Sequence, residues 1–176
     1  ELLIRRAQRG DADAFEQLLL EHQKNVYNLC YRMAGNPDDA MDLSQETFLR
    51  AWRCLDQYQF ASAFSTWLYR LCSNICIDFL RRRRRQQTVP LTFEDADGEE
   101  QTYAVPDAQP LPAEQVELKL TRETLAAAMA QLLPEHRAVL QLRVVNEMSY
   151  EQIADVLDIQ IGTVKSRLSR ARNQLK

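Results

Sequence analysis

The carboxyl-terminal stretch "MSYEQIADVLDIQIGTVKSRLSRARNQLK", Met148–Lys176, indicates the fold of this chain. Ser149 and Gln152 form the pattern of a capping box, so a short helix is expected to begin there. The apolar residues of this helix share one inward face: Ile153, Ala154 and Leu157. A turn around 158–160 leads to a second helix that begins near Gly162 or Thr163. Asp158 stands where such turns often have glycine, and aspartate tolerates turn conformations. The spacing predicts a helix-turn-helix.

The second helix of this motif separates apolar from basic side chains. Its inward face is Val164, Leu168, Ala171 and Leu175, and its outward face is Ser166, Ser169, Arg170 and Asn173. Lys165, Arg167 and Arg172 flank the outward face, as side chains that contact phosphates do. Residues 160–176 contain no acid, so DNA reading is favoured over the alternative of a solvated charged helix.

An earlier segment, "FSTWLYRLCSNICIDFLRRRRRQQ" (Phe64–Gln87), predicts a long helix that ends in a basic run. Apolar residues at intervals of three and four form its buried face: Phe64, Trp67, Leu68, Leu71, Cys72, Ile75 and Phe79. The opposite, exposed strip is expected to hold Tyr69, Arg70, Ser73, Asn74, Ile77 and the arginines. A stripe of this kind is more often core than a ligand site, so most of the aromatic content is interpreted as packing.

Helix-ending residues divide the rest of the amino-terminal half into three helices. They are expected at residues 2–9, at 12–33, and from Pro37 to about Leu55. Gly10 and Gly35 end the first two, and Asn36 followed by Pro37 starts the third. The third helix is expected to bury Ala40, Leu43, Phe48, Ala51, Trp52 and Leu55. Residues 56–64 are predicted to form a loop.

An acidic segment separates this half from the helix-turn-helix. Residues 86–118 carry eight acids and no Lys or Arg, and without those acids the chain has 22 bases against 17 acids. The overall net charge of −3 therefore conceals two basic patches. Four prolines interrupt residues 86–112. We therefore predict an all-α fold of two small helical domains, 1–85 and 113–176, joined by a flexible acidic linker over 86–112.

Several functional classes receive no support from the sequence. No apolar run is long enough to span a membrane, and the amino end lacks the features of a secretory signal. His22 and His136 are isolated and no glycine-rich phosphate loop exists, so an enzyme is not expected. The cysteines are Cys30, Cys54, Cys72 and Cys76. Buried free thiols in a reducing cytosol are favoured over a metal site that would pair Cys72 and Cys76 with a histidine. No metal, no cofactor and a cytoplasmic location are predicted.

Three motifs, in order and over nearly the whole chain, resemble bacterial RNA polymerase sigma factors of the extracytoplasmic-function (ECF) class. They are "DLSQETFLRAW" (Asp42–Trp52), "FSTWLYRLCSNICID" (Phe64–Asp78) and "SYEQIADVLDIQIGTVKSRLSRAR" (Ser149–Arg172). The resemblance implies an amino-terminal domain that binds the β′ clamp helices and recognises and melts the −10 promoter element. It implies a carboxyl-terminal domain that reads the −35 element and touches the β flap. It also implies a sequestering anti-sigma factor, and no direct insertion into a membrane.

The resemblance assigns roles to individual residues. Polymerase contacts are expected from Asp42, Gln45, Glu46, Leu49 and Arg50. Contacts with the −10 element are expected from Tyr58, Phe60, Ser62, Phe64, Arg70 and Asn74. Contacts with the DNA backbone phosphates there are expected from Arg81, Arg82, Arg83, Arg84 and Arg85. The −35 element is assigned to Thr163, Lys165, Ser166, Arg167, Ser169, Arg170 and Arg172. In the −10 loop, "YQFASAF" departs from the family pattern "FRGxSxF" because it has neither the Arg nor the Gly. The identity of the captured base therefore stays open.

The alternative interpretation is a stand-alone helix-turn-helix regulator, with amino-terminal helices that sense a ligand or dimerise. Such a regulator needs neither the motif at Asp42–Trp52 nor a second basic patch at 81–85, so these two features separate the hypotheses.

Overall fold

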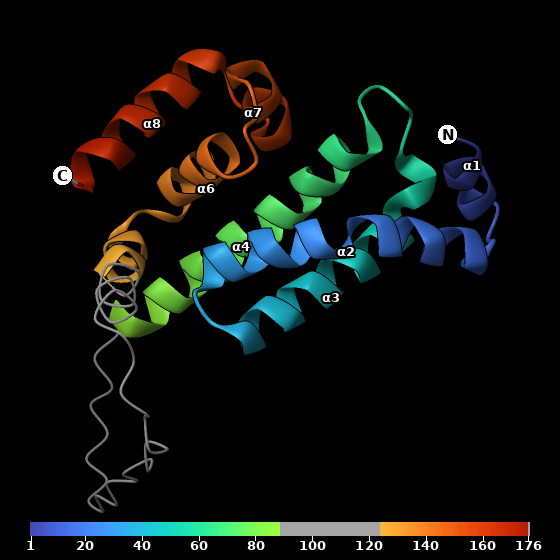
Figure 1. Cartoon of the computed structure of the whole chain (residues 1–176), viewed down its shortest axis with the longest axis horizontal. Helices are drawn as coiled ribbons and strands as arrows, with labels where there is room; N and C mark the ends of the chain where they lie inside the picture. The colour runs from blue at the N-terminus through green and yellow to red at the C-terminus, as the bar shows by residue number, and fades with distance from the viewer. Residues whose placement is uncertain (89–123, 176) are drawn as a thin grey trace, which may run out of the picture.

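The computed structural model describes residues 1–88 and 124–175, and all regular elements of this part of the chain are helical. The amino-terminal half contains α1 (Leu2–Gln8), α2 (Ala12–Ala34), α3 (Pro37–Cys54), the short 3₁₀ helix η1 (Leu55–Gln57) and α4 (Phe64–Thr88). The carboxyl-terminal half contains a helical segment at 124–131, α6 (Pro134–Val144), α7 (Tyr150–Leu157) and α8 (Ile161–Gln174). The all-α prediction is confirmed (Figure 1).

Local sequence signals set the helix boundaries. The Asp11 carboxylate accepts from the Ala14 N–H at the start of α2, and the Asn36 side chain accepts from the Asp39 N–H at 2.8 Å before α3. Gly35 ends α2 in the left-handed region, with φ at 88°. A Cβ at that φ would strain the backbone, which accounts for the glycine. The predicted stops and caps are therefore confirmed.

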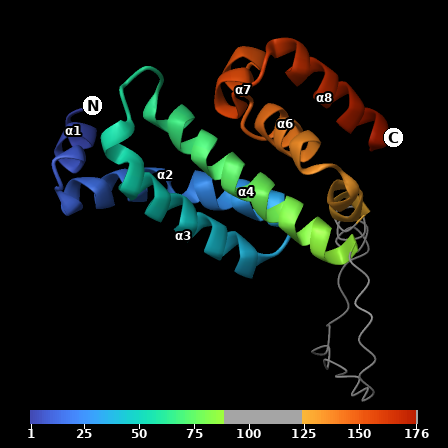
Figure 2. The same ribbon diagram turned by 180° about the vertical axis from the view of Figure 1, so that it is seen from behind.

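The amino-terminal helices α2, α3 and α4 form one bundle, and α1 packs at one end of α2. Figures 1 and 2 show α1 at one end of the domain, and α2, α3 and α4 packed alongside one another. Their buried residues, such as Leu18, Leu29, Leu43 and Leu68, belong to one continuous core. Apolar burial of this kind is the main stabilising contribution to a small helical domain.

The carboxyl-terminal helices lie directly against the bundle, and both α6 and α7 contact α4 (Figures 1 and 2). The Arg137 guanidinium donates to the Met33 carbonyl, and Asn146 donates to the Tyr69 hydroxyl at 3.3 Å. This docking corrects one expectation. Ser73 and Ile77 were predicted to lie on an exposed strip of α4, but they are 1% and 7% exposed, and Ile77 lies beside Leu157 and Ile159 of the second domain.

The predicted linker begins within the last turn of α4. Helix α4 continues to Thr88, so the first residues assigned to the linker are helical. The predicted flexible acidic linker, from residue 89 to 112, lies outside the described residues, as does the predicted helical start at 113. Described structure resumes in a helix at residue 124.

Candidate nucleic-acid and polymerase interfaces

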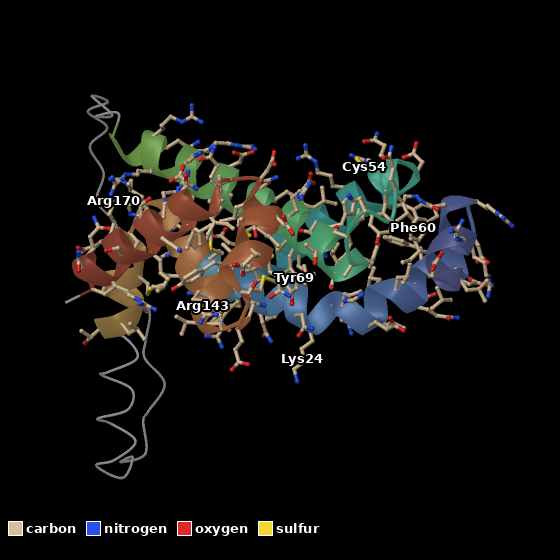
Figure 3. All side chains as sticks on the ribbon, turned by 90° about the horizontal axis from the view of Figure 1, so that it is seen from above. Lys24, Cys54, Phe60, Tyr69, Arg143 and Arg170 are labelled. Atoms are coloured by element: carbon tan, nitrogen blue, oxygen red, sulfur yellow. The ribbon has the colours of Figure 1, made fainter. Side chains whose placement is uncertain are left out.

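Helix α8 presents a basic, polar face to solvent. The capping box at Ser149 and Gln152 starts α7, and Asp158 ends it in the left-handed region with φ 52° and ψ 51°. Val164, Leu168 and Ala171 are buried, as predicted. The exposed residues of α8 with polar or basic side chains are Lys165, Ser166, Ser169, Arg170, Arg172, Asn173 and Gln174. Figure 3 shows Arg170 at the end of the molecule away from Phe60. A helix of this composition matches the hydrogen-bonding groups of a major groove.

Two residues assigned to the −35 element lie apart from this face. Thr163 is half-buried, and its carbonyl oxygen accepts from the Ser166 hydroxyl at 3.0 Å. Arg167 is half-buried and lines a cavity of about 370 Å³ between the two domains, together with Arg50, Asn74 and Glu135. In this arrangement Arg167 points toward the first domain, because the cavity lies between α8 and α4.

The outward side of α4 is only partly accessible. Asn74 is exposed and lines the same cavity between the domains. Arg70 is half-buried, and its guanidinium donates to the Asp155 carbonyl of α7. Arg70 and Asn74, both assigned to the −10 element, therefore face the second domain.

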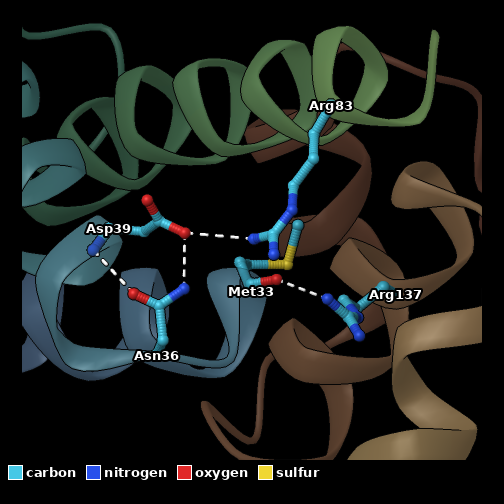
Figure 4. A network of polar contacts seen from close by, with 5 residues as sticks. All are labelled: Met33, Asn36, Asp39, Arg83 and Arg137. Atoms are coloured by element: carbon cyan, nitrogen blue, oxygen red, sulfur yellow. Dashed lines mark hydrogen bonds and ion pairs between the residues drawn. The ribbon is translucent and has the colours of Figure 1, made fainter. Parts of the chain in front are cut away.

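The five arginines at 81–85 are all exposed, and two of them form ion pairs with carboxylates of other helices. Arg81 donates from Nε to the Glu135 carboxylate at 2.8 Å, across the domain boundary. Arg83 donates to the Asp39 carboxylate at 3.1 Å, within the first domain (Figure 4). Arg82 and Arg85 lie at the solvent-exposed end of α4. Burial would raise the pKa of Glu135, but the hydrogen bond from its own backbone N–H and the Arg81 guanidinium outweigh it and lower that pKa.

The loop at 58–63 has an aromatic base. Tyr58 is 6% exposed and Phe64 is 9% exposed, and the Tyr58 ring lies 5.7 Å from Phe64 and 5.3 Å from Trp67, between centroids. The Tyr58 hydroxyl donates to the Ser62 carbonyl at 2.6 Å, and burial raises its pKa. Gln8 of α1 donates to the carbonyls of Leu55 and Tyr58, both at 2.9 Å. Tyr58 and Phe64, both assigned to the −10 element, are therefore buried residues that support the loop, and they are not accessible to DNA in this structure.

Phe60 has a backbone conformation that is uncommon for a residue with a side chain. Its φ is 60°, in the left-handed region that favours glycine. It occupies the glycine position of the pattern "FRGxSxF" to which this loop was compared. The ring packs on Tyr58 at 4.8 Å between centroids, and the Arg5 guanidinium lies 4.8 Å above it. These contacts hold the non-glycine residue in place.

Helix α3 carries the residues assigned to polymerase contacts on its outer surface. The five of them are exposed: Asp42, Gln45, Glu46, Leu49 and Arg50. They do not all face the same feature. Gln45 and Leu49 line an apolar groove of about 420 Å³ between α2 and α3, whereas Arg50 lines the cavity between the domains.

The groove includes residues that the sequence did not single out. Met41 is 52% exposed and Trp52 is 39% exposed, and with Phe15 and Leu19 of α2 they form its apolar walls. Trp52 was expected in the buried stripe of α3, and it instead packs at the surface, 4.8 Å from the Phe15 ring centroid. Large exposed apolar side chains clustered in a groove are typical of protein-binding surfaces. Met41, Gln45 and Leu49 are four residues apart and so share one face of α3, and this spacing was the sequence signal for the groove.

Comparison with known proteins agrees with this architecture. The family model of Sigma-70 region 2 matches residues 18–86, and that of Sigma-70 region 4 matches residues 122–175. The chain is 32% identical to the ECF RNA polymerase sigma factor SigW of Bacillus subtilis, covering 98% of this chain and 92% of the relative. It is 38% identical to the RNA polymerase sigma-H factor of Pseudomonas aeruginosa, covering 98% and 90%.

Solved structures give the same result. CnrH, in a complex with the cytosolic domain of CnrY, matches with a TM-score of 0.68 and 26% identity, over 99% of this chain and 92% of that one. The sigma factor RpoE of Bartonella quintana, in a complex with the anti-sigma factor NepR, matches with a TM-score of 0.63 and 28% identity, over 92% and 93%. Two Sigma-70 domains in this order define a sigma factor. The chain belongs to the ECF RNA polymerase sigma factors.

No helix among the described residues is long and apolar enough to cross a membrane.

Proposed function

We propose that this sigma factor holds core RNA polymerase through the outer surface of α3 and the adjoining groove, and reads promoter DNA with α4 and α8. The observation that carries the proposal is the groove walled by Met41, Leu49 and Trp52, beside the exposed polar row of α3. An apolar surface at this place suits a protein partner. The match to both Sigma-70 regions, 2 and 4, does not favour the stand-alone regulator.

Within the −10 region, we assign the direct contacts to exposed groups. Asn74 carries an amide that can pair with a base edge, and Arg82 and Arg85 are exposed at the end of α4. The loop is held rigidly from below by Tyr58, Phe64 and Gln8. A rigid loop suits the capture of an unstacked base, since binding energy must offset an unstacking cost of a few kcal/mol. Phosphate contacts from the arginines would add affinity without sequence preference.

For the −35 element, we assign base contacts to Ser166, Ser169 and Arg170, and phosphate contacts to Lys165 and Arg172. Arg167 joins them only if the second domain leaves the first, because it now lines the cavity between the domains. The same holds for Arg70, which bonds to α7. DNA binding by α4 therefore requires that α6 and α7 move away from it.

Further partners follow from the same assignment. The second domain would contact the β flap of the polymerase, and an anti-sigma factor would compete for the polymerase-binding surfaces. The proposed place of action is the cytoplasm, and the proposed role is binding and positioning, with no catalytic step of its own.

Size-exclusion chromatography of the full chain with purified core polymerase tests the proposal. Co-elution is expected for the wild type and for a Lys165→Ala, Arg170→Ala double variant. The double variant should lose selective binding to −35 duplex DNA, because the substitutions remove cationic groups from α8 alone. Absence of co-elution for the wild type would refute the polymerase assignment. Loss of co-elution in the double variant would refute the division of roles between the domains.

A further inference from the structure

Three of the four cysteines meet in the core of the amino-terminal domain. Cys30 comes from α2, and Cys72 and Cys76 come from successive turns of α4. The Cys30 sulfur lies 3.4 Å from that of Cys72 and 3.8 Å from that of Cys76, and all three sulfurs lie within 4.8 Å of one another. Each of the three residues is 0% exposed. We call this group the cysteine triad.

The spacing of the sulfurs suits a single bound ion. Sulfur ligands lie about 2.3 Å from a soft metal ion such as zinc, so three ligands around one ion stand about 4 Å apart. The triad has nearly these separations already. Cys72 and Cys76 are one helical turn apart and point to the same side of α4, where α2 supplies the third sulfur. Binding therefore needs only small movements of side chains.

The ligand set selects the ion. Among residues 1–88 and 124–175, no His, Asp or Glu side chain joins the three sulfurs. The hydroxyl of Thr47, buried beside Cys30, donates to the Leu43 carbonyl at 2.7 Å. Structural zinc sites need four ligands, and hard ions need oxygen ligands, so neither is well served here. Sulfur ligands alone, in low number, favour Cu(I).

We propose that the cysteine triad is a Cu(I)-binding site that joins α2 to α4. Binding requires thiolates, so the thiol protons leave as the ion enters. Because the triad is buried, the ion enters during folding or by local opening of the bundle. Asn74 lies between Cys72 and Cys76 on the same helix, so copper would stabilise the element that carries the proposed −10 contacts.

Anaerobic titration of the full chain tests the proposal. Reduced protein is refolded with Cu(I), passed over a desalting column in the presence of a Cu(I) chelator, and assayed for retained copper. We expect one copper ion per chain, an upward shift in the thermal unfolding midpoint, and X-ray absorption showing sulfur ligands alone. A wild-type chain that retains no copper would overturn the proposal. So would absorption that shows nitrogen or oxygen ligands, or preferred retention of Zn(II) in a parallel titration.

Cysteine variants assign the ligands. Cys30→Ala should lose the retained copper, and alanine keeps the helix intact. Cys54, half-buried at the end of α3 and outside the triad, provides the matched control, and Cys54→Ala should retain copper like the wild type. Copper retention by Cys30→Ala, or its loss in Cys54→Ala, would contradict the assignment. If Cys30→Ala fails to fold, the X-ray absorption of the wild type decides the question.

Discussion

Arg137 of α6 donates a hydrogen bond to the carbonyl oxygen of Met33 in the last turn of α2, across the boundary between the two domains (Figure 4). Its Nε donates to the Met129 carbonyl at 2.7 Å, in the last turn of the helical segment 124–131. The side chain is buried, at 5% exposure. The carboxyl ends of two helices, where the dipoles are negative, therefore stabilise this buried cation in place of a carboxylate. Burial lowers its pKa, and so does the charge of Arg83.

Replacing Arg137 should loosen the contact between the domains. Arg137→Ala removes hydrogen bonds from a charged donor, so we expect the free energy of unfolding to fall by about 2–3 kcal/mol. The radius of gyration measured by small-angle X-ray scattering should rise as the domains separate. Arg143→Ala is the control, because Arg143 is on the same helix and bonds the Met148 carbonyl at 2.8 Å within the second domain. An equal rise in both variants would contradict the role given to Arg137.

Acid should weaken the contact between Arg81 and Glu135. Of the groups that lower the pKa of Glu135 below the usual 4.5, Arg81 lies in the other domain, so this ion pair favours the docked state while Glu135 is ionised. The docked state binds fewer protons at Glu135 than the separated state. The ion pair therefore stabilises docking fully above about pH 4.5, and this stabilisation is lost as the pH falls through the folded pKa of Glu135. Scattering between pH 7 and pH 3.5 measures the separation. In Glu135→Gln, the domain separation that Glu135 causes on acidification should vanish. If the variant separates over the same pH range and to the same extent as the wild type, Glu135 is not the cause.

The groove on α3 should carry much of the affinity for polymerase. Leu49→Glu places a charge in its apolar wall, and loss of a buried interface contact of about 1–2 kcal/mol predicts a Kd raised roughly 5- to 30-fold. Leu20→Glu is a matched control, since Leu20 is 56% exposed against 52% for Leu49 and does not line the groove. Fluorescence anisotropy of the labelled variants, titrated with core polymerase, gives the Kd of each. Equal affinities for the two variants would remove the groove from the interface.

At position 60, a glycine variant should be more stable than an alanine variant, which is the reverse of the usual order of stability. The left-handed region costs a side-chain-bearing residue about 1–2 kcal/mol. Alanine normally gains about 0.4–1 kcal/mol over glycine by restricting the unfolded chain. Phe60→Gly should therefore be more stable than Phe60→Ala by roughly 0.5–1 kcal/mol, although both lose the packing on Tyr58. Urea unfolding with equal m-values measures this, and a more stable alanine variant would show that the loop relaxes out of the left-handed conformation.

Local signals in the sequence account for most of the fold. The capping box at Ser149, the Asn36–Pro37 start of α3 and the inward face of α8 were all predicted, because each depends on residues within a few turns of one another. Periodicity identifies an apolar face, but it does not identify a second surface that docks on the polar side. Ile77 was misplaced for this reason, since it lies beside Leu157 and Ile159.

The residues that were missed belong to contacts between distant segments. Arg137 bonds to Met33 from 104 positions away, and Cys30 joins Cys72 from 42 positions away. Nothing in the spacing of either segment encodes these pairs. Trp52 was misplaced because an aromatic residue at a helical interval is usually buried, whereas here it walls a surface groove.

Run-off transcription with purified core polymerase tests the central claim most directly. The template would carry promoters selected from a random library by the reconstituted complex. We predict transcripts of defined length that appear only when both the chain and core polymerase are present, and that disappear with Lys165→Ala plus Arg170→Ala. Transcription by core polymerase that is unchanged when the chain is added, on every selected template, would contradict the assignment as a promoter-specificity subunit.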